Sequence, residues 1–388
     1  MTPAQRVAVV GGGHNGLVAA AYLAQAGLEV TVLERLDSVG GAAVSTQAFE
    51  GVDARLSRYS YLVSLLPARI IRELRLDIRL TRRRYSSFTP EPGSSRALLI
   101  DHGDPRATAD SFAGIGATAD ASAWTDFYEG TTTLARSLFP TVCDPLLTRH
   151  EARRALGNDA LWAALIEEPI GHHIESSFEN DLVRGVAFTD ALIGTFAPAH
   201  DETLAANRCF VYHVIGNGTG DWDVPVGGMG SVSGALESAA RTSGATIITG
   251  ADVTSITPDG EVGYRRGGIE HTAGFDVVLS GVAPHVLARL FGEEPPARPE
   301  GEIMLAPACL QITVCDRPCC PGPWISTMSS YFTPPSNSDH STPLAMGVTN
   351  PAISGVTPAG TLCTMEFHGR KTYCAKPPQR CGAFSVDV

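Results

Sequence analysis

Residues 7–42 read VAVVGGGHNGLVAAAYLAQAGLEVTVLERLDSVGGA, and this stretch decides the fold of the N-terminal part of the chain. The valine-rich run at 7–10 is typical of a parallel strand buried on both faces, and it leads directly into a glycine turn. The alanine- and leucine-rich segment 17–26 predicts a helix that ends at Gly27. A further apolar run at 30–33 predicts a second strand.

The glycine turn has the spacing G-x-G-x-x-G between a strand and a helix. Gly11 permits the tight turn, Gly13 lets the backbone approach a pyrophosphate, and Gly16 lets the helix pack close to the strand. The helix start supplies free N–H groups and a positive dipole end, so phosphates need no lysine. Glu34 ends the second strand 18 residues after Gly16, where a carboxylate can accept hydrogen bonds from an adenosine ribose. These residues predict a dinucleotide-binding site.

The acid is followed by a glycine pair, Gly40 and Gly41, in the pattern E-x5-G-G that marks the FAD-binding branch of this fold. The stretch 11–43, followed by SYLVSLLPARIIREL and SSFTP, resembles the phytoene-desaturase-related FAD oxidoreductases, which are amine-oxidase-like flavoproteins. Within them it is most similar to the group called pyridine nucleotide-disulphide oxidoreductase domain-containing protein 2. The resemblance runs from about residue 7 to about residue 298.

The resemblance implies FAD as cofactor and an α/β fold, in which a Rossmann-like FAD-binding domain at 1–60 and 221–300 holds an inserted α+β substrate domain at 61–220. It also implies contacts at Val253, on a strand that lies against the adenine in the family, and at Gly281, in a G-V-A segment that passes near the cofactor. Motif and resemblance together predict the cofactor-binding residues Gly11, Gly13, His14, Asn15, Gly16, Glu34, Arg35, Gly40, Gly41, Val253 and Gly281.

The middle of the chain predicts helical stretches such as 121–138 and 151–168, separated by proline-containing breaks. The chain returns to the FAD domain with a glycine cluster at 227–230, followed by a helix at 232–243 and strands at 246–248, 253–256 and 276–280. The glycine cluster has two interpretations. A second dinucleotide loop, for NAD(P)H, would need a buried strand before it, and the acids and proline at 221–225 make a poor one. A glycine-rich helix N-terminus that faces the flavin or substrate is therefore favoured.

Length and composition predict two domains, since 388 residues with 44% apolar content can bury a sizeable core. A net charge of −12 argues against a general nucleic-acid binder. The sequence has no run of 18 apolar residues and no signal peptide, so we expect a cytoplasmic protein. Nothing in the sequence predicts the oligomeric state.

One segment is unusually basic. Apolar residues at roughly helical spacing interleave with its arginines, so a helix could place the guanidinium groups outside and an apolar stripe inside. A solvated helix face is the simpler interpretation. The alternative is a surface that docks peripherally on anionic lipid while an apolar substrate is taken up. The arginines are Arg69, Arg72, Arg75, Arg79, Arg82, Arg83 and Arg84, and the apolar residues are Ile70, Ile71, Leu74 and Ile78.

The last 80 residues differ in composition from the rest. Both lysines of the chain and seven of its nine cysteines lie from Cys309 onward, and residues 329–360 have the composition of a loop. The resembled family instead ends in a G-G-rich segment that returns to the flavin. We therefore expect residues 301–388 to be an atypical tail, frame-shifted or disordered, rather than a divergent domain. Cys315 and Cys320 have the C-x4-C spacing of a redox pair but lie far from the first glycine loop, and no zinc-ligand spacing occurs, so no metal is predicted.

These features together predict an FAD-dependent oxidoreductase that removes a hydride from a small hydrophobic or amine-like substrate. The alternatives are a truncated, non-catalytic FAD-binding fragment and an NAD-dependent dehydrogenase. No catalytic residue can be assigned, because the flavin accepts the hydride and the protein supplies orientation and a dry pocket. Arg55, Arg58 and Tyr59 are polar candidates near the cofactor, although a surface position is the favoured interpretation for each. His172, His173 and His213 are candidate acid/base groups, although a solvated loop or a satisfied core position is favoured for each.

Overall fold

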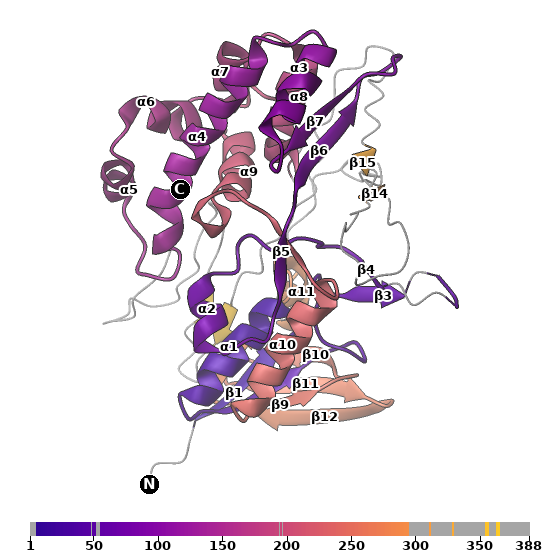
Figure 1. Ribbon diagram of the computed structural model, residues 1–388. Helices are drawn as coiled ribbons and strands as arrows, with labels where there is room; N and C mark the ends of the chain where they lie inside the picture. Colours follow the sequence, from indigo (N-terminus) through magenta and orange to yellow (C-terminus); the bar gives the residue numbers. More distant parts are fainter. Residues whose placement is uncertain are drawn as a thin grey trace.

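The structure is a computed structural model with two lobes, a sheet with its helices below and a mostly helical lobe above (Figure 1). It describes residues 5–47, 49–51, 55–193, 195 and 197–294, and four short strands at 310–311, 328–329, 354–356 and 362–364. Within this part of the chain, no helix is both long enough and apolar enough to cross a membrane.

A six-stranded sheet forms the lower lobe, in the order β17-β16-β13-β1-β2-β9. Parallel pairing joins β13 to β1, β1 to β2 and β2 to β9, whereas β16 runs antiparallel to β13. Four of the five residues of β1 are buried, as its valine-rich run predicts. The strands are β1 (Arg6–Val10), β2 (Glu29–Leu33), β9 (Thr246–Ile248), β13 (Val277–Ser280), β16 (Ser354–Val356) and β17 (Leu362–Thr364).

Alternate residues of β1 enter two different cores, because successive side chains of a strand point to opposite faces. Val7 and Val9 pack with α1 (His14–Gln25) and α10 (Met229–Thr242). Ala8 and Val10 pack on the other face, against a second, three-stranded sheet and α11. Both faces of the parallel sheet are thus covered, and the predicted Rossmann-like α/β fold class is confirmed. The second layer consists of β10 (Asp252–Ile256), β11 (Glu261–Arg266), β12 (Ile269–Gly274) and α11 (Pro284–Leu290).

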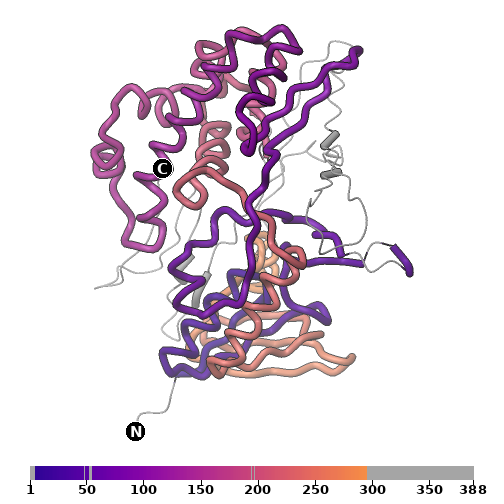
Figure 2. The backbone as a smooth tube through the Cα atoms, viewed as in Figure 1, coloured from indigo at the N-terminus to yellow at the C-terminus, as the bar shows by residue number. Residues whose placement is uncertain are grey.

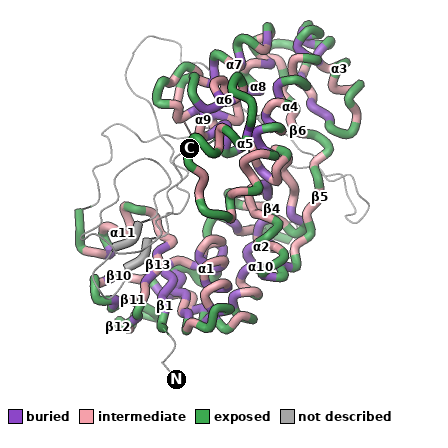
Figure 3. Tube along the Cα trace, turned by 90° about the vertical axis from the view of Figure 1, so that its left-hand side faces the viewer, coloured by how far each residue is buried: buried purple, intermediate pink, exposed green. Residues whose placement is uncertain are grey.

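The upper lobe has its own core, in which Phe112, Phe127, Phe178 and Phe210 are almost fully buried. Figure 3 shows buried segments inside each of the two lobes. A hairpin of β6 (Tyr85–Pro90) and β7 (Ala97–Asp101) packs on the helices. The helices are α3 (Pro105–Gly114), α4 (Asp120–Leu138), η1 (Phe139–Thr141), α5 (Arg149–Leu156), α6 (Asp159–Trp162), η2 (Ala163–Glu167), α7 (Ile170–Ser177), α8 (Asp181–Leu192), α9 (Ala205–Val214) and η3 (Gly216–Gly218).

The chain passes between the lobes in two adjacent segments, which Figure 2 lets the reader follow. The outgoing β5 (Leu80–Arg82) pairs antiparallel with the returning β8 (Asp223–Pro225). The helical lobe is therefore connected as an insertion between parts of the sheet lobe, while the domain boundaries at 60 and 221 stay a prediction. The remaining described elements are α2 (Ala68–Glu73), the hairpin of β3 (Ser45–Gln47) and β4 (Arg55–Ser57), and the pair of β14 (Leu310–Gln311) and β15 (Met328–Ser329).

The single helix expected over the arginine-rich segment is wrong. Helix α2 ends at Glu73, because the backbone turns at Arg75, which has a positive φ of 51°, and β5 is then drawn into pairing with β8. The apolar stripe does face inward, since Leu74 is buried in the core next to α1. Several of the arginines are already paired: Arg69 with Glu73 and Asp144, Arg82 with Asp221, and Arg84 with Asp101. Lipid docking by this segment stays a prediction.

The other sequence-predicted elements are found with small changes. The helix expected at 121–138 is α4, and the strands at 246–248, 253–256 and 276–280 are β9, β10 and β13. The stretch 151–168 is broken after α5, because Gly157 adopts a φ of 65° and Asn158 caps the following helix by accepting from the N–H of Leu161. The predictions for residues 301–388 and for their cysteines concern residues outside those described, apart from the backbone of the four short strands.

Candidate dinucleotide site

The glycine turn between β1 and α1 is built as its spacing predicts. Gly11 has a φ of 97°, which side chains other than glycine rarely adopt, and its N–H donates to the Leu33 carbonyl at 2.8 Å. A Cβ at Gly16 would overlap the Gly11 carbonyl oxygen, so a side chain there would push α1 away from β1. These two glycines therefore fix the turn and the position of the helix start.

Gly13 differs from them, because its missing side chain leaves open space. A Cβ there would meet nothing nearer than the Cα of Gly41, at 3.9 Å. Gly13 and Gly40 form an isolated parallel β-bridge, and the Gly40 N–H donates to the Gly12 carbonyl at 2.8 Å. Gly40 and Gly41 both have positive φ, 123° and 58°. The predicted second glycine pair thus lies directly against the first loop, and neither strip of backbone carries a side chain.

Glu34 lies beside this loop at the end of β2 and is only 8% exposed. Its carboxylate accepts two backbone hydrogen bonds, from Gly12 N–H at 2.7 Å and from Leu36 N–H at 2.8 Å. A carboxylate has about four acceptor positions, so about two remain for further donors. A Cβ at Gly12 would lie 2.9 Å from Val39 and 3.2 Å from the Glu34 carboxylate, so this middle glycine is also required. The sequence reasoning assigned no role to it, although its place inside the triple glycine was a signal.

Of the two positions taken from the family resemblance, one lies at the loop. Gly281 follows β13, donates its N–H to the Val10 carbonyl at 2.8 Å, and has its carbonyl carbon 3.7 Å from where a Cβ of Gly11 would stand. Val253 lies on β10 and packs in the core that includes Val10. The chain just before β10 is hydrogen-bonded to the backbone of Glu34, because the Ala251 N–H donates to the Glu34 backbone carbonyl.

Three further predicted residues flank the loop. His14 begins α1, and its Nδ1 is buried with no hydrogen-bond partner in the described part of the chain. Burial lowers the pKa of His14, so the ring is neutral near pH 7. Asn15 is half-buried in the first turn of α1, and Arg35 is exposed just beyond Glu34. An orphaned buried nitrogen at a helix start beside an open strip of backbone fits a polar ligand at this position.

The second glycine cluster starts α10 but is closed off. The N–H groups of Met229 and Gly230 donate to the hydroxyls of Ser57 and Ser45, on the β4 and β3 strands of the neighbouring hairpin. Serines of the chain itself therefore satisfy these two N–H groups, and a helix start that faces the flavin or substrate stays a prediction. Nor is the preceding β8 part of the parallel sheet, so a second dinucleotide loop is not built here.

The other polar candidates have ordinary surroundings. Arg58 stacks over the exposed ring of Tyr59, at 5.1 Å. His213 is buried, stacks on Trp222 and shares a hydrogen bond between its Nδ1 and the Cys209 carbonyl. Among the described residues, no group of three metal-ligating side chains could hold an ion.

The fold and this site together define a class: a protein with a Rossmann-like domain whose glycine loop and strand-end acid are arranged to hold a dinucleotide. In agreement, the family model of the NAD(P)-binding Rossmann-like domain matches residues 9–69.

Comparison with curated proteins gives the relatives. An uncharacterized protein of Mycobacterium tuberculosis, Rv0897c, is 54% identical over 299 residues, which are 74% of this chain and 56% of that protein. Pyridine nucleotide-disulfide oxidoreductase domain-containing protein 2 of Mus musculus is 32% identical over 324 residues, 74% of this chain and 54% of that protein. A limonene dehydrogenase polypeptide of Castellaniella defragrans is 45% identical over 62 residues, 16% of this chain and 11% of that protein.

The chain is thus homologous to pyridine nucleotide-disulfide oxidoreductase domain-containing protein 2, and the resemblance seen in its sequence is confirmed. It spans little more than half the length of these first two relatives.

Proposed function

We propose that the chain binds FAD at the glycine loop and belongs to an oxidoreductase that removes a hydride from a small apolar or amine-like substrate. The observation that carries the proposal is the contact of Gly13 with Gly40 and Gly41, which extends the side-chain-free backbone beyond the first loop. The E-x5-G-G pattern that places those glycines there is the FAD-branch feature of the sequence. The homologous protein's name, which contains "oxidoreductase", supports the same reaction class.

The chain's own residues would bind and orient the cofactor. The start of α1 offers backbone N–H groups to the phosphates, and no side chain of Gly13 or Gly41 would obstruct them. Glu34, already held by Gly12 and Leu36, would accept hydrogen bonds from ribose hydroxyls with its remaining lone pairs. When bound, the flavin would supply the hydride acceptor, so the protein needs no nucleophile of its own.

A flavin spectrum tests the proposal. We expect the purified protein to carry or take up FAD without a covalent bond and to show the visible absorption of an oxidised flavin. NAD-dependent dehydrogenation is the second candidate, favoured by the NAD(P)-binding description of the matching family. Saturable NAD binding in the absence of any FAD uptake would reject the first proposal in favour of the second.

Turnover is a separate question from binding. A truncated FAD-binding fragment would show the flavin spectrum but no loss of it with a substrate. Anaerobic mixing with a panel of apolar alcohols, terpenes and amines distinguishes the two cases, because a substrate that transfers a hydride bleaches the oxidised band. The dehydrogenase name of the limonene relative makes cyclic terpenes a reasonable first group of compounds.

A further inference from the structure

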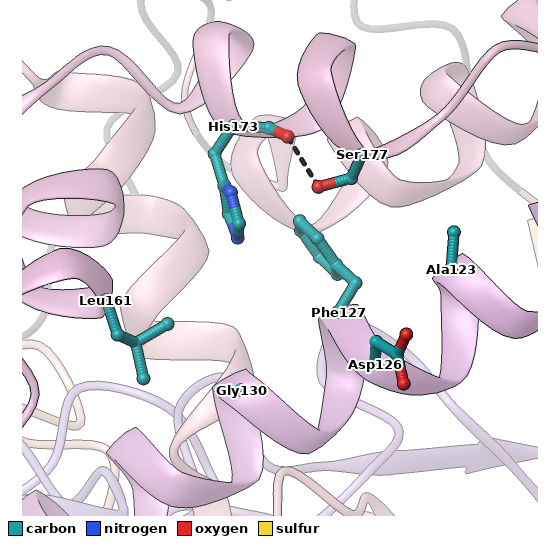
Figure 4. Close-up of a pocket in the computed structure, with 7 residues that line it drawn as sticks. All are labelled: Ala123, Asp126, Phe127, Gly130, Leu161, His173 and Ser177. Atoms are coloured by element: carbon teal, nitrogen blue, oxygen red, sulfur yellow. Dashed lines mark hydrogen bonds between the residues drawn. The ribbon is translucent and has the colours of Figure 1, made fainter.

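The upper lobe contains a cavity of about 290 Å3, and none of its lining residues belongs to the glycine loop. It lies between α4, α6 and α7, and Figure 4 shows the side chains around it. Its lining residues are Ala123, Asp126, Phe127, Gly130, Leu161, His173 and Ser177. The volume suits a small molecule of one ring and a short arm, near the lower end of ligand-site sizes.

One wall of the cavity is aromatic. The rings of Phe127 and His173 stack with centroids 4.9 Å apart and planes 24° apart. Phe127 is only 4% exposed, so the His173 ring stacks on a buried side chain. Opposite this wall lies the apolar side chain of Leu161, which can approach α4 because Gly130 has no side chain: a Cβ there would be 3.3 Å from the Leu161 Cδ1. A side chain at position 130 would therefore press against Leu161 in the lining of the cavity.

The charge in the lining is unbalanced. Asp126 is exposed at the rim, and within the described residues it makes no ion pair and no hydrogen bond. Burial lowers the pKa of His173, so that its ring is neutral near pH 7 and offers no positive charge to the carboxylate. The Ser177 hydroxyl is occupied as a donor, because it donates to the His173 carbonyl at 2.7 Å. The lining therefore has one uncompensated negative charge beside an aromatic and aliphatic surface.

We propose that this cavity binds a small organic cation, a protonated amine with an apolar body, with its ammonium group at Asp126 and its body between Leu161 and the Phe127–His173 stack. Attraction of cations to aromatic faces adds to the carboxylate's contribution. An anionic ligand would be repelled by Asp126, and a neutral ligand would gain nothing from its charge. The cavity shares no lining residue with the glycine loop.

The test is a binding titration of the whole chain, monitored by ligand-observed NMR. It uses three probes of similar shape and different charge. Benzylamine, protonated at pH 7.5, should bind with a Kd on the order of 1 mM, as expected of a ligand of this size. Benzyl alcohol and benzoate should bind more weakly, by about three- to fivefold or more, the range of a solvent-exposed ion pair.

Two substitutions on α4 form a matched pair. Asp126→Asn should weaken benzylamine binding by about three- to fivefold, whereas Glu129→Gln, which also removes an exposed carboxylate from α4 but lies outside the cavity lining, should leave it unchanged. Gly130→Leu should abolish binding by filling the cavity, and a thermal melt would verify that this variant is folded. Gly13→Ala should not affect benzylamine binding, which separates the cavity from the glycine loop.

Three results would overturn the proposal: equal affinity for all three probes, equal effects of Asp126→Asn and Glu129→Gln, or no saturable benzylamine binding. Displacement of benzylamine by FAD would also overturn it, since it would place the amine in the dinucleotide site instead.

Discussion

The backbone N–H of Gly12 donates to the Oε2 of Glu34 at 2.7 Å, so the acid at the end of β2 is tied to the glycine loop at the end of β1. The other carboxylate oxygen accepts from Leu36 N–H. The acid thus holds the loop in shape, and we propose that its remaining lone pairs accept hydrogen bonds from a ribose. A substitution of Glu34 should therefore affect folding and binding together.

Glu34→Gln is expected to lower the free energy of unfolding by about 1–3 kcal/mol, because the amide nitrogen of glutamine cannot accept and leaves either the buried Gly12 N–H or the part-buried Leu36 N–H without its partner. FAD affinity should fall in the same variant. Urea unfolding and flavin titration measure the two effects. Glu29→Gln is the control, since Glu29 is an exposed residue of the same strand. Equal stability of the two variants would contradict the structural task of Glu34.

Gly13→Ala should separate binding from folding. The φ and ψ of Gly13, −70° and 169°, suit alanine, and the new Cβ would meet nothing closer than 3.9 Å. Stability should change by less than about 0.5 kcal/mol. The methyl group would occupy the space through which a pyrophosphate approaches the backbone, so FAD affinity should fall at least about tenfold. Unchanged affinity in a folded Gly13→Ala protein would mean that the dinucleotide binds elsewhere.

Gly16→Ala should have the opposite profile, with a loss of stability as its main effect. The added Cβ would overlap the Gly11 carbonyl oxygen and stand 3.3 Å from Val9. Overpacking of this kind costs about 1–3 kcal/mol. The matched control is Gly185→Ala in α8, where a Cβ meets nothing within 4 Å and the exposed helix interior should gain roughly 0.5–1 kcal/mol. Thermal melts that move in the same direction for both variants would refute the close contact of α1 with β1.

The sequence was sufficient for the parts of the site that depend on neighbours in the chain. Gly11, Gly13, Gly16 and Glu34 follow from strand, turn and helix signals within 30 residues. The same pattern singled out Gly40 and Gly41, and the structure adds the contact of Gly40 with the loop. Gly12 was missed because the motif allows any residue there, whereas the structure needs a glycine to admit the Glu34 carboxylate.

Contacts between distant segments were not predictable in this way. The arginine-rich segment was expected to be one helix, but β5 pairs with β8, more than 140 residues farther along. Periodicity reports on local geometry and contains no information about such a partner. Similarly, the serines that cap α10 come from a hairpin about 170 to 185 residues earlier, and nothing in the glycine cluster itself indicates them.

Stability should also depend on pH through Asp101, at the end of β7. Its side chain is 2% exposed, accepts from the Arg84 guanidinium at 2.9 and 3.0 Å, and accepts from Gly103 N–H at 2.8 Å. The hydrogen bonds from Arg84 hold the pKa of Asp101 below its usual 3.8. Because the folded pKa is lowered, the stabilisation is present in full above pH 3.8 and is lost as the pH falls through the folded value. Asp101→Asn should thus destabilise the protein at pH 7, and the difference from the unsubstituted chain should narrow in acid.

The control for that prediction is Asp110→Asn on α3, because Asp110 is 77% exposed and its nearest approach to Arg106 is 4.0 Å. Its loss should change the unfolding free energy by less than about 0.5 kcal/mol at any pH. Urea unfolding of the three proteins between pH 7 and pH 3 provides the measurement. If Asp101→Asn keeps a constant stability deficit over this range, charge on Asp101 is not what stabilises the β6–β7 hairpin, and its hydrogen bonds to neutral donors are sufficient. If the deficit shrinks in acid while Asp110→Asn stays flat, the Arg84–Asp101 pair is the pH-dependent contact of this lobe.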